Sequence, residues 1–146
     1  MIVGIHHTAL STRDADRLVA FYRDLFGFSV EFDFPWDEKN EAFEKSHAVG
    51  KTAGRVVMIA NGASRLEIFE YRKPVPRPDV PGRANADLGI GHFCIEVRDI
   101  EKEYERLRAA GMRFQSELVA QTPTIVNCYG RDPDGNLIEL IEFKAA

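Results

Sequence analysis

The sequence predicts an α+β fold built from two tandem βαβββ modules. The first observation is an internal repeat, because Gly4–Asp14 (GIHHTALSTRD) returns as Gly89–Asp99 (GIGHFCIEVRD). Each copy is followed by an amphipathic helical pattern that stops at a glycine. Each half then closes on a similar strand pattern, Leu66–Tyr71 (LEIFEY) or Ile138–Phe143 (IELIEF). The order strand, helix and three strands is therefore expected twice.

The first module is expected over residues 1–72. Asp is a favoured helix N-cap, Gly adopts the left-handed conformation that ends helices, and Asn-Gly favours a tight hairpin turn. These signals predict a strand over 3–12, a helix capped by Asp14 and ended by Gly27, a strand over 28–34, and a hairpin of 55–60 and 65–71 around Asn61-Gly62.

A linker over residues 73–88 and a second module over 89–146 complete the expected organisation. Four prolines in Lys73–Arg83 favour an extended linker. The second module should contain the first strand, a helix capped by Asp99 and ended by Gly111, a strand near 112–117, and a hairpin of 124–131 and 136–143.

The two modules differ by one insertion. His7 and Glu67 are sixty residues apart, whereas His92 and Glu139 are forty-seven apart. The excess falls between the second and third strands of the first module. We therefore expect a surface insertion over residues 35–52 that holds a helical turn or two.

Composition excludes several classes of protein. A chain of 146 residues with 45% hydrophobic residues can bury a core, and its net charge of −4 without a Lys/Arg cluster argues against a nucleic-acid partner. The two cysteines make no disulfide framework. No apolar run approaches about eighteen residues, and the first residues show a strand pattern rather than a signal peptide. We expect a cytoplasmic protein that has a small-molecule substrate and no membrane partner.

The repeat places one His and one Glu at equivalent positions of each half. His7 and His92 lie in the first strands, and Glu67 and Glu139 lie in the last strands. Alternation places each Glu among apolar side chains on its strand, where an unpaired carboxylate would be costly. A divalent metal would offset that cost, so these four residues are the expected ligands. By contrast, Glu70 and Glu142 point the other way and are expected to be external charges.

Several further residues have less definite expected roles. Cys94 is expected to be a buried small apolar residue, and His47 to be exposed to solvent. Trp36, Phe43 and Tyr129 either line a cavity or pack in the core.

The motifs around these positions resemble the vicinal oxygen chelate superfamily, which includes glyoxalase I, methylmalonyl-CoA epimerase, extradiol dioxygenases and bleomycin-resistance proteins. The resemblance rests on His7–Asp14, Phe21–Phe28 (FYRDLFGF) and Gly130–Leu140 (GRDPDGNLIEL). Within the superfamily, Arg65–Pro78 and the segment after Gly89 look like a lactoylglutathione-lyase-like branch that includes cyclitol epimerases. The resemblance implies that each module forms half of a barrel and that two halves pair around one metal. The pairing occurs either within one chain or across a homodimer, which is the expected assembly.

The family's metal positions map onto His7, Glu67, His92 and Glu139. Such ligands suit Ni, Co, Zn, Mn or Fe and leave two places for water or substrate. The resemblance implies proton transfer next to a carbonyl through an enediolate, with Glu67 or Glu139 as the catalytic base. Two alternatives are a ring-cleaving dioxygenase, disfavoured because Glu67 stands where that class has a His, and a binding protein that sequesters an antibiotic without chemistry.

Overall fold

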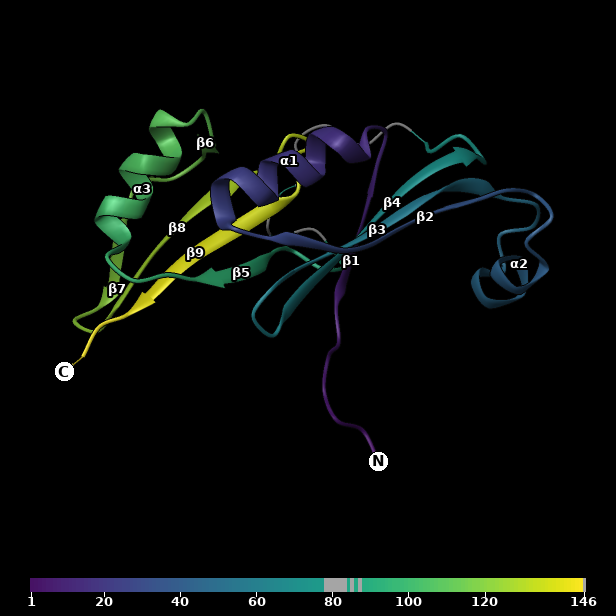
Figure 1. Ribbon diagram of the computed structural model, residues 1–146. Coiled ribbons are helices and arrows are strands. Elements are labelled where there is room, and N and C mark those ends of the chain that lie inside the picture. Colours follow the sequence, from purple (N-terminus) through teal and green to yellow (C-terminus); the bar gives the residue numbers. More distant parts are fainter. Residues whose placement is uncertain (78–83, 85, 87, 146) are drawn as a thin grey trace. The chain divides into compact units, whose positions relative to one another are not determined.

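The strands of the computed structural model form two sheets, which belong to two compact units, Met1–Asp79 and Val80–Ala146 (Figure 1). The structure describes residues 1–77, 84, 86 and 88–145. Much of the proline-rich segment expected as a linker therefore lies outside the described residues. Within each unit, a parallel pair joins the first strand to the last, and the remaining strands are antiparallel. The expected α+β fold is confirmed.

The first unit contains a four-stranded sheet in the order β1-β4-β3-β2. Its strands and helices are β1 (Thr8–Thr12), α1 (Ala15–Phe26), β2 (Ser29–Trp36), α2 (Glu41–His47), β3 (Ala53–Asn61) and β4 (Ser64–Lys73). Helix α2 lies in the expected insertion, beyond the end of β2 (Figure 1). The hairpin of β3 and β4 turns at Gly62. Its φ of 58° lies in the left-handed region, which glycine adopts most easily.

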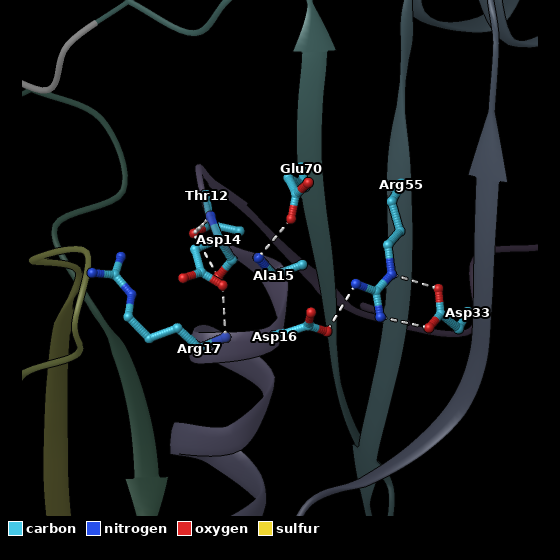
Figure 2. Close-up of polar contacts among 8 residues, drawn as sticks. All are labelled: Thr12, Asp14, Ala15, Asp16, Arg17, Asp33, Arg55 and Glu70. Carbon is cyan, nitrogen blue, oxygen red and sulfur yellow. Dashed lines mark hydrogen bonds and ion pairs between the residues drawn. The ribbon is translucent and has the colours of Figure 1, made fainter.

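Helix α1 begins and ends where the sequence predicts. The Asp14 carboxylate accepts a hydrogen bond from the Arg17 N–H at 2.9 Å, and Gly27 adopts a φ of 69° beyond the last turn. A second carboxylate also caps this helix, because Glu70 in β4 accepts from the Ala15 N–H at 2.8 Å (Figure 2). Glu70 is therefore a helix cap, and its expected role as an external charge was wrong.

The second unit contains a five-stranded sheet, in which β5, β9, β8 and β6 follow one another and β7 also pairs with β8. Its elements are β5 (Phe93–Glu96), α3 (Ile100–Ala109), β6 (Arg113–Phe114), β7 (Val119–Thr122), β8 (Ile125–Arg131) and β9 (Leu137–Phe143). The expected strand near 112–117 is reduced to two residues, and β7 was not expected.

Two further expectations at the starts of elements were wrong. The strand expected over 3–12 begins only at Thr8, and the side chains of Ile2, Val3 and Ile5 before it are almost fully exposed. Asp99 makes no side-chain cap on α3 and instead adopts a φ of 55°. The Glu142 carboxylate takes that role, accepting from the Asp99 N–H at 2.7 Å and the Ile100 N–H at 3.4 Å.

Strand alternation gives each sheet one face toward its helix and one face away from it. In the first sheet, Arg55 lies on the helix side, where it contacts Asp33 of β2 and Asp16 of α1 (Figure 2). Glu67 is an odd number of residues from Glu70 along β4, so it lies on the opposite face. The buried core on the helix side includes Leu10, Leu18, Tyr22, Val57, Ile59, Leu66 and Ile68.

No helix among the described residues is long and apolar enough to cross a membrane.

Candidate functional site

The first unit brings His7 and Glu67 together. His7 Nε2 lies 3.1 Å from Glu67 Oε2, and the two side chains are 34% and 19% exposed. His7 directly precedes β1, and β1 runs parallel to β4 with Ala9 opposite Glu67. The neighbouring His6 contacts the other nitrogen of the His7 ring, with 2.9 Å between the two Nδ1 atoms. That contact orients the ring so that Nε2 faces the carboxylate.

The second unit forms the same pair from the equivalent elements. His92 Nε2 lies 3.0 Å from Glu139 Oε2, and the Glu139 side chain is only 11% exposed. Cys94 of β5 is opposite Glu139 of β9 in the parallel ladder, as Ala9 is opposite Glu67. The His92 ring meets the edge of Tyr129 at a centroid distance of 5.3 Å.

The donor chemistry and spacing of both pairs fit a divalent metal. Metal–ligand bonds of about 2.1 Å at right angles separate two neighbouring ligand atoms by about 3.0 Å. The observed separations of 3.1 Å and 3.0 Å match this distance between two ligand atoms. Imidazole and carboxylate ligands also suit borderline divalent ions. Each unit thus presents half of the expected ligand set. Within the described residues, no single cluster of three or more His, Cys, Asp or Glu side chains is positioned to hold an ion.

Apolar and aromatic side chains surround Glu67 on its face of the first sheet. Met58 is its neighbour on β3, and Phe69 is the next residue along β4 on the same face. Phe69 packs with Trp36 and Tyr71 at centroid distances of 6.1 Å and 5.6 Å. Burial, and then the negative charge of Glu67, raises the pKa of the Tyr71 hydroxyl. Tyr71 therefore stays neutral beside this carboxylate at physiological pH.

The inserted helix α2 adds to the same aromatic cluster. Phe43 stacks on Trp36 with 4.2 Å between centroids, and His47 stacks on Phe43 at 3.9 Å. Trp36 is also fixed by a hydrogen bond from its Nε1 to Thr52 Oγ1 at 2.9 Å. His47 is exposed as expected, but it is held on an aromatic ring rather than free in solvent.

Glu139 has polar neighbours instead. Asn127 Nδ2 donates to Glu139 Oε1 at 2.6 Å, and Gln121 Nε2 donates to Asn127 Oδ1 at 3.1 Å. Sequence reasoning missed Asn127, although a lone Asn inside the apolar run Ile125–Cys128 was a signal that a buried partner exists. Cys94 is exposed rather than buried as expected. Partial burial, together with the charge of Glu139 and a hydrogen bond to it, raises the pKa of the Cys94 thiol to about 12.

Comparisons with known proteins agree with this arrangement. The family model described as the glyoxalase/bleomycin resistance protein/dioxygenase superfamily matches residues 4–140. A 2-epi-5-epi-valiolone epimerase from Actinomyces is 31% identical over 150 residues, which cover 98% of this chain and 81% of the relative. Glyoxalase I of Saccharomyces cerevisiae is 30% identical over 159 residues, covering 96% of this chain but only 45% of the yeast protein.

A solved structure supports the fold independently of close sequence similarity. A glyoxalase family protein from Bacillus cereus superposes with a TM-score of 0.89 at 21% identity, covering 99% of this chain and 97% of that one. Relatives of the chain thus include a lyase-type enzyme and an epimerase, both of which process small molecules.

Proposed function

Since the chain belongs to the glyoxalase/bleomycin resistance protein/dioxygenase superfamily, we propose that it is a metal-dependent enzyme that transfers a proton at a carbon next to a carbonyl. The observation that carries the proposal is the repeated His–Glu pair, with 3.1 Å and 3.0 Å between the ligand atoms. Relatives of both the glyoxalase I and the epimerase type support this class of reaction.

In this proposal, His7, Glu67, His92 and Glu139 hold one divalent ion. A bound ion supplies Lewis acidity toward the carbonyl and a neighbouring oxygen of the substrate. Ni, Co, Zn, Mn and Fe all accept imidazole and carboxylate ligands of this kind.

The proton is carried by the two candidate glutamates, Glu67 and Glu139. A carboxylate beside the substrate takes the proton from the carbon next to the carbonyl. Its return by the same glutamate to the neighbouring carbon gives isomerisation, whereas delivery of a proton by the other glutamate to the opposite face of the original carbon gives epimerisation. Glu67 is one candidate for this role, and its neighbours on the same face of the sheet, Met58 and Phe69, are buried apolar side chains.

Metal binding is the first test. Purified chain, stripped with a chelator and reconstituted with Co²⁺ or Ni²⁺, should bind about one ion per site by elemental analysis. His7→Ala and His92→Ala should weaken binding severely, because each removes a ligand. Glu70→Gln is the matched control, since Glu70 lies on β4 beside Glu67 but on the other face of the sheet. Specific binding that survives both His variants would contradict the assigned site.

Proton exchange is the second part of the test. With Co²⁺ or Ni²⁺ bound, the chain should place deuterium from D₂O at the carbon beside the carbonyl of 2-epi-5-epi-valiolone or of dihydroxyacetone. NMR measures how fast the deuterium enters. Replacing the true base by Gln should slow exchange by about 10²–10⁴-fold, the usual contribution of general acid–base catalysis. Full exchange in both Glu67→Gln and Glu139→Gln with metal retained would contradict a carboxylate base. Oxygen uptake with Fe²⁺ would instead favour a dioxygenase.

We also propose that the chain forms a homodimer. Strand β2 is an edge of the first sheet, and its Phe32 and Phe34 side chains are 44% and 51% exposed. An exposed apolar edge strand is a surface that a partner chain covers in a stable protein. Light scattering should give a dimer at micromolar concentration, and Phe34→Glu should shift it toward monomer. Lys102→Glu, a charge reversal on α3, is the control, and a monomeric wild type would refute the proposal.

A further inference from the structure

Helix α2 places the ring of His47 beside the face of the first sheet that carries Glu67. Phe69 follows Glu67 by two residues on β4, so the two residues share a face and lie about 6.6 Å apart along the strand. The His47 ring meets the Phe69 ring edge-on at a centroid distance of 5.7 Å. Four rings in all surround Phe69, those of Trp36, Phe43, His47 and Tyr71. The insertion therefore contributes an aromatic cluster to the candidate site.

Contacts within α2 fix the His47 ring and assign its proton. His47 Nδ1 lies 3.1 Å from the Phe43 carbonyl oxygen, which can only accept, so Nδ1 carries the proton. Ser46 Oγ donates to the same carbonyl at 3.1 Å and accepts from Nδ1 at 2.8 Å. The other nitrogen, Nε2, is then the acceptor of the neutral ring and faces away from the helix backbone. Because the ring is exposed, this acceptor is open to a ligand.

Glu44 provides a second acceptor on α2. It lies three residues before His47 and is therefore its neighbour on the helix surface. Its Oε1 is buried and has no hydrogen-bond donor among the residues that the structure describes. Lys45 pairs with Glu41 at 3.6 Å rather than with Glu44. Two neighbouring acceptors and a carboxylate charge favour a ligand that donates O–H groups, and they disfavour a ligand that carries a carboxylate or a phosphate.

We propose that His47 is a substrate-binding residue whose Nε2 accepts a hydrogen bond from a hydroxyl group of the substrate, and that the substrate is an uncharged, polyhydroxylated cyclic ketone. This inference rests on the proposed function, because it requires the reacting carbon to lie beside Glu67. The half-buried rings of Phe43 and Tyr71 then pack on the ring carbons of the substrate, as aromatic side chains do in small-molecule sites. A hydroxyl remote from the carbonyl meets His47, which makes His47 a determinant of substrate choice.

The acceptor nitrogen can be observed directly by NMR. In chain labelled with ¹⁵N-histidine, at about pH 8.5, where an ordinary imidazole is neutral, the ring whose signals vanish in His47→Phe should have its proton on Nδ1. With Zn²⁺ added, 2-epi-5-epi-valiolone should shift the Nε2 resonance upfield, because an accepted hydrogen bond engages the lone pair. The probe 2-hydroxycyclohexanone, which lacks the remote hydroxyls, should leave it in place. A ring protonated on Nε2, or a resonance that 2-epi-5-epi-valiolone does not move, would refute the inference.

Kinetics test whether this contact selects the substrate. Deuterium entry into both ketones is measured with the Co²⁺-loaded chain. His47→Phe keeps a ring that stacks on Phe43 but removes the acceptor, so KM for 2-epi-5-epi-valiolone should rise by roughly 2–10-fold, the contribution of one hydrogen bond, with kcat little changed. KM for 2-hydroxycyclohexanone should not change. His47→Gln, which offers an amide oxygen in place of Nε2, should recover most of the loss. Lys51→Ala, at an exposed position of the same insertion, is the control.

The outcomes separate this inference from the proposed function. A wild-type chain that exchanges neither ketone refutes the proposed function, while the Nε2 resonance still decides whether His47 binds the polyhydroxylated ring. Exchange of both ketones with an equal response to His47→Phe refutes the role of His47 and leaves the proposed function standing. A fall in kcat with KM unchanged also refutes it, because a contact remote from the carbonyl acts on affinity. Thermal denaturation checks that each variant is folded.

Discussion

Glu70 and Glu142 each hold the first turn of a helix from a strand of the neighbouring sheet. Backbone N–H groups at a helix N-terminus lack partners within the helix, and a carboxylate there is favoured by both hydrogen bonding and the helix dipole. The Glu70 carboxylate lies 2.8 Å from the Ala15 nitrogen, and Glu142 lies 2.7 Å from the Asp99 nitrogen. Each cap fixes its helix against the strand that also carries a candidate ligand.

Removing the Glu70 cap should destabilise the first unit. Glu70→Ala leaves the Ala15 N–H without its acceptor, and the free energy of unfolding should fall by about 0.5–2 kcal/mol, the usual range for a lost cap. Glu70→Gln keeps an acceptor oxygen and should retain most of the stability. Urea denaturation measures both, and Glu101→Ala, which removes an exposed ion pair with Lys144, serves as a control with a smaller effect. Equal losses for Glu70→Ala and Glu101→Ala would contradict the cap.

At the residue scale, local signals were predictable from the sequence and cross-strand partners were not. Asp14 and Gly27 lie next to the helix that they delimit, so spacing alone identified them. Glu70 reaches a helix fifty-five positions earlier in the chain, and its role depends on how β4 lies beside α1. Asp99 shows the same effect, because Glu142 supplies the cap that the local sequence assigns to Asp99.

At the scale of elements, Gly54 allows β3 to pass beneath the indole of Trp36. A Cβ at Gly54 would overlap the Glu70 carbonyl oxygen and the Trp36 ring, and neither is the free end of a flexible side chain. The register of β3 and β4 also shifts between Ala53 and Gly54. The aromatic cluster beside Glu67 therefore depends on the absence of a side chain at this position.

Gly54→Ala should destabilise the chain and alter the surroundings of its single tryptophan. Overpacking of a closely packed core costs about 1–3 kcal/mol. Urea denaturation gives the loss, and the emission of Trp36 should change because the ring must move. Gly130→Ala is the matched control, since the added Cβ there meets mainly the flexible end of Met112. A larger loss for Gly130→Ala than for Gly54→Ala would contradict this account.

The insertion was predictable from the sequence, whereas the edge strands of the second module were predicted less well. The thirteen-residue excess correctly placed an insertion after the second strand, and α2 forms within it. The strand expected near 112–117 was found but is shorter than expected, and the additional β7 was missed, because both β6 and β7 obtain their hydrogen bonds from β8 rather than from a strong pattern of their own. Whether a segment at the edge of a sheet forms a strand therefore depends on its hydrogen bonds to the neighbouring strand.

At the scale of the whole molecule, a metal that binds only the folded chain should raise its stability. At a free Co²⁺ concentration of about 100 times the dissociation constant, the stabilisation should be about 2.7 kcal/mol. The unfolding temperature should therefore rise with added Co²⁺ and fall again with a chelator. His92→Ala should abolish the dependence while Glu117→Ala, an exposed carboxylate, should keep it. A Co²⁺-independent unfolding temperature in the wild type would contradict the metal site.

The candidate ligands could be predicted because the duplication presents them twice. His7 with Glu67 and His92 with Glu139 occupy matching places, and the structure brings the members of each pair within 3.1 Å. The assembly of all four around one ion stays a prediction, as does the identity of the base. Asn127 escaped notice because its partner is set by the register of β8 and β9, which no spacing along the chain reveals.

The Glu70 cap separates the part of the first unit that must be kept in evolution from the part that can vary. Glu67 is held by a ladder on both sides and by a helix anchored three residues further along the same strand. Helix α2 and its flanking loops contribute aromatic rings to the same face, but they form neither the strand pairing nor the helix cap that holds Glu67 in place. Under the proposed function, loop exchange or lengthening between Asp37 and Lys51 should therefore alter which compounds are accepted and leave the pairing of His7 with Glu67 unchanged.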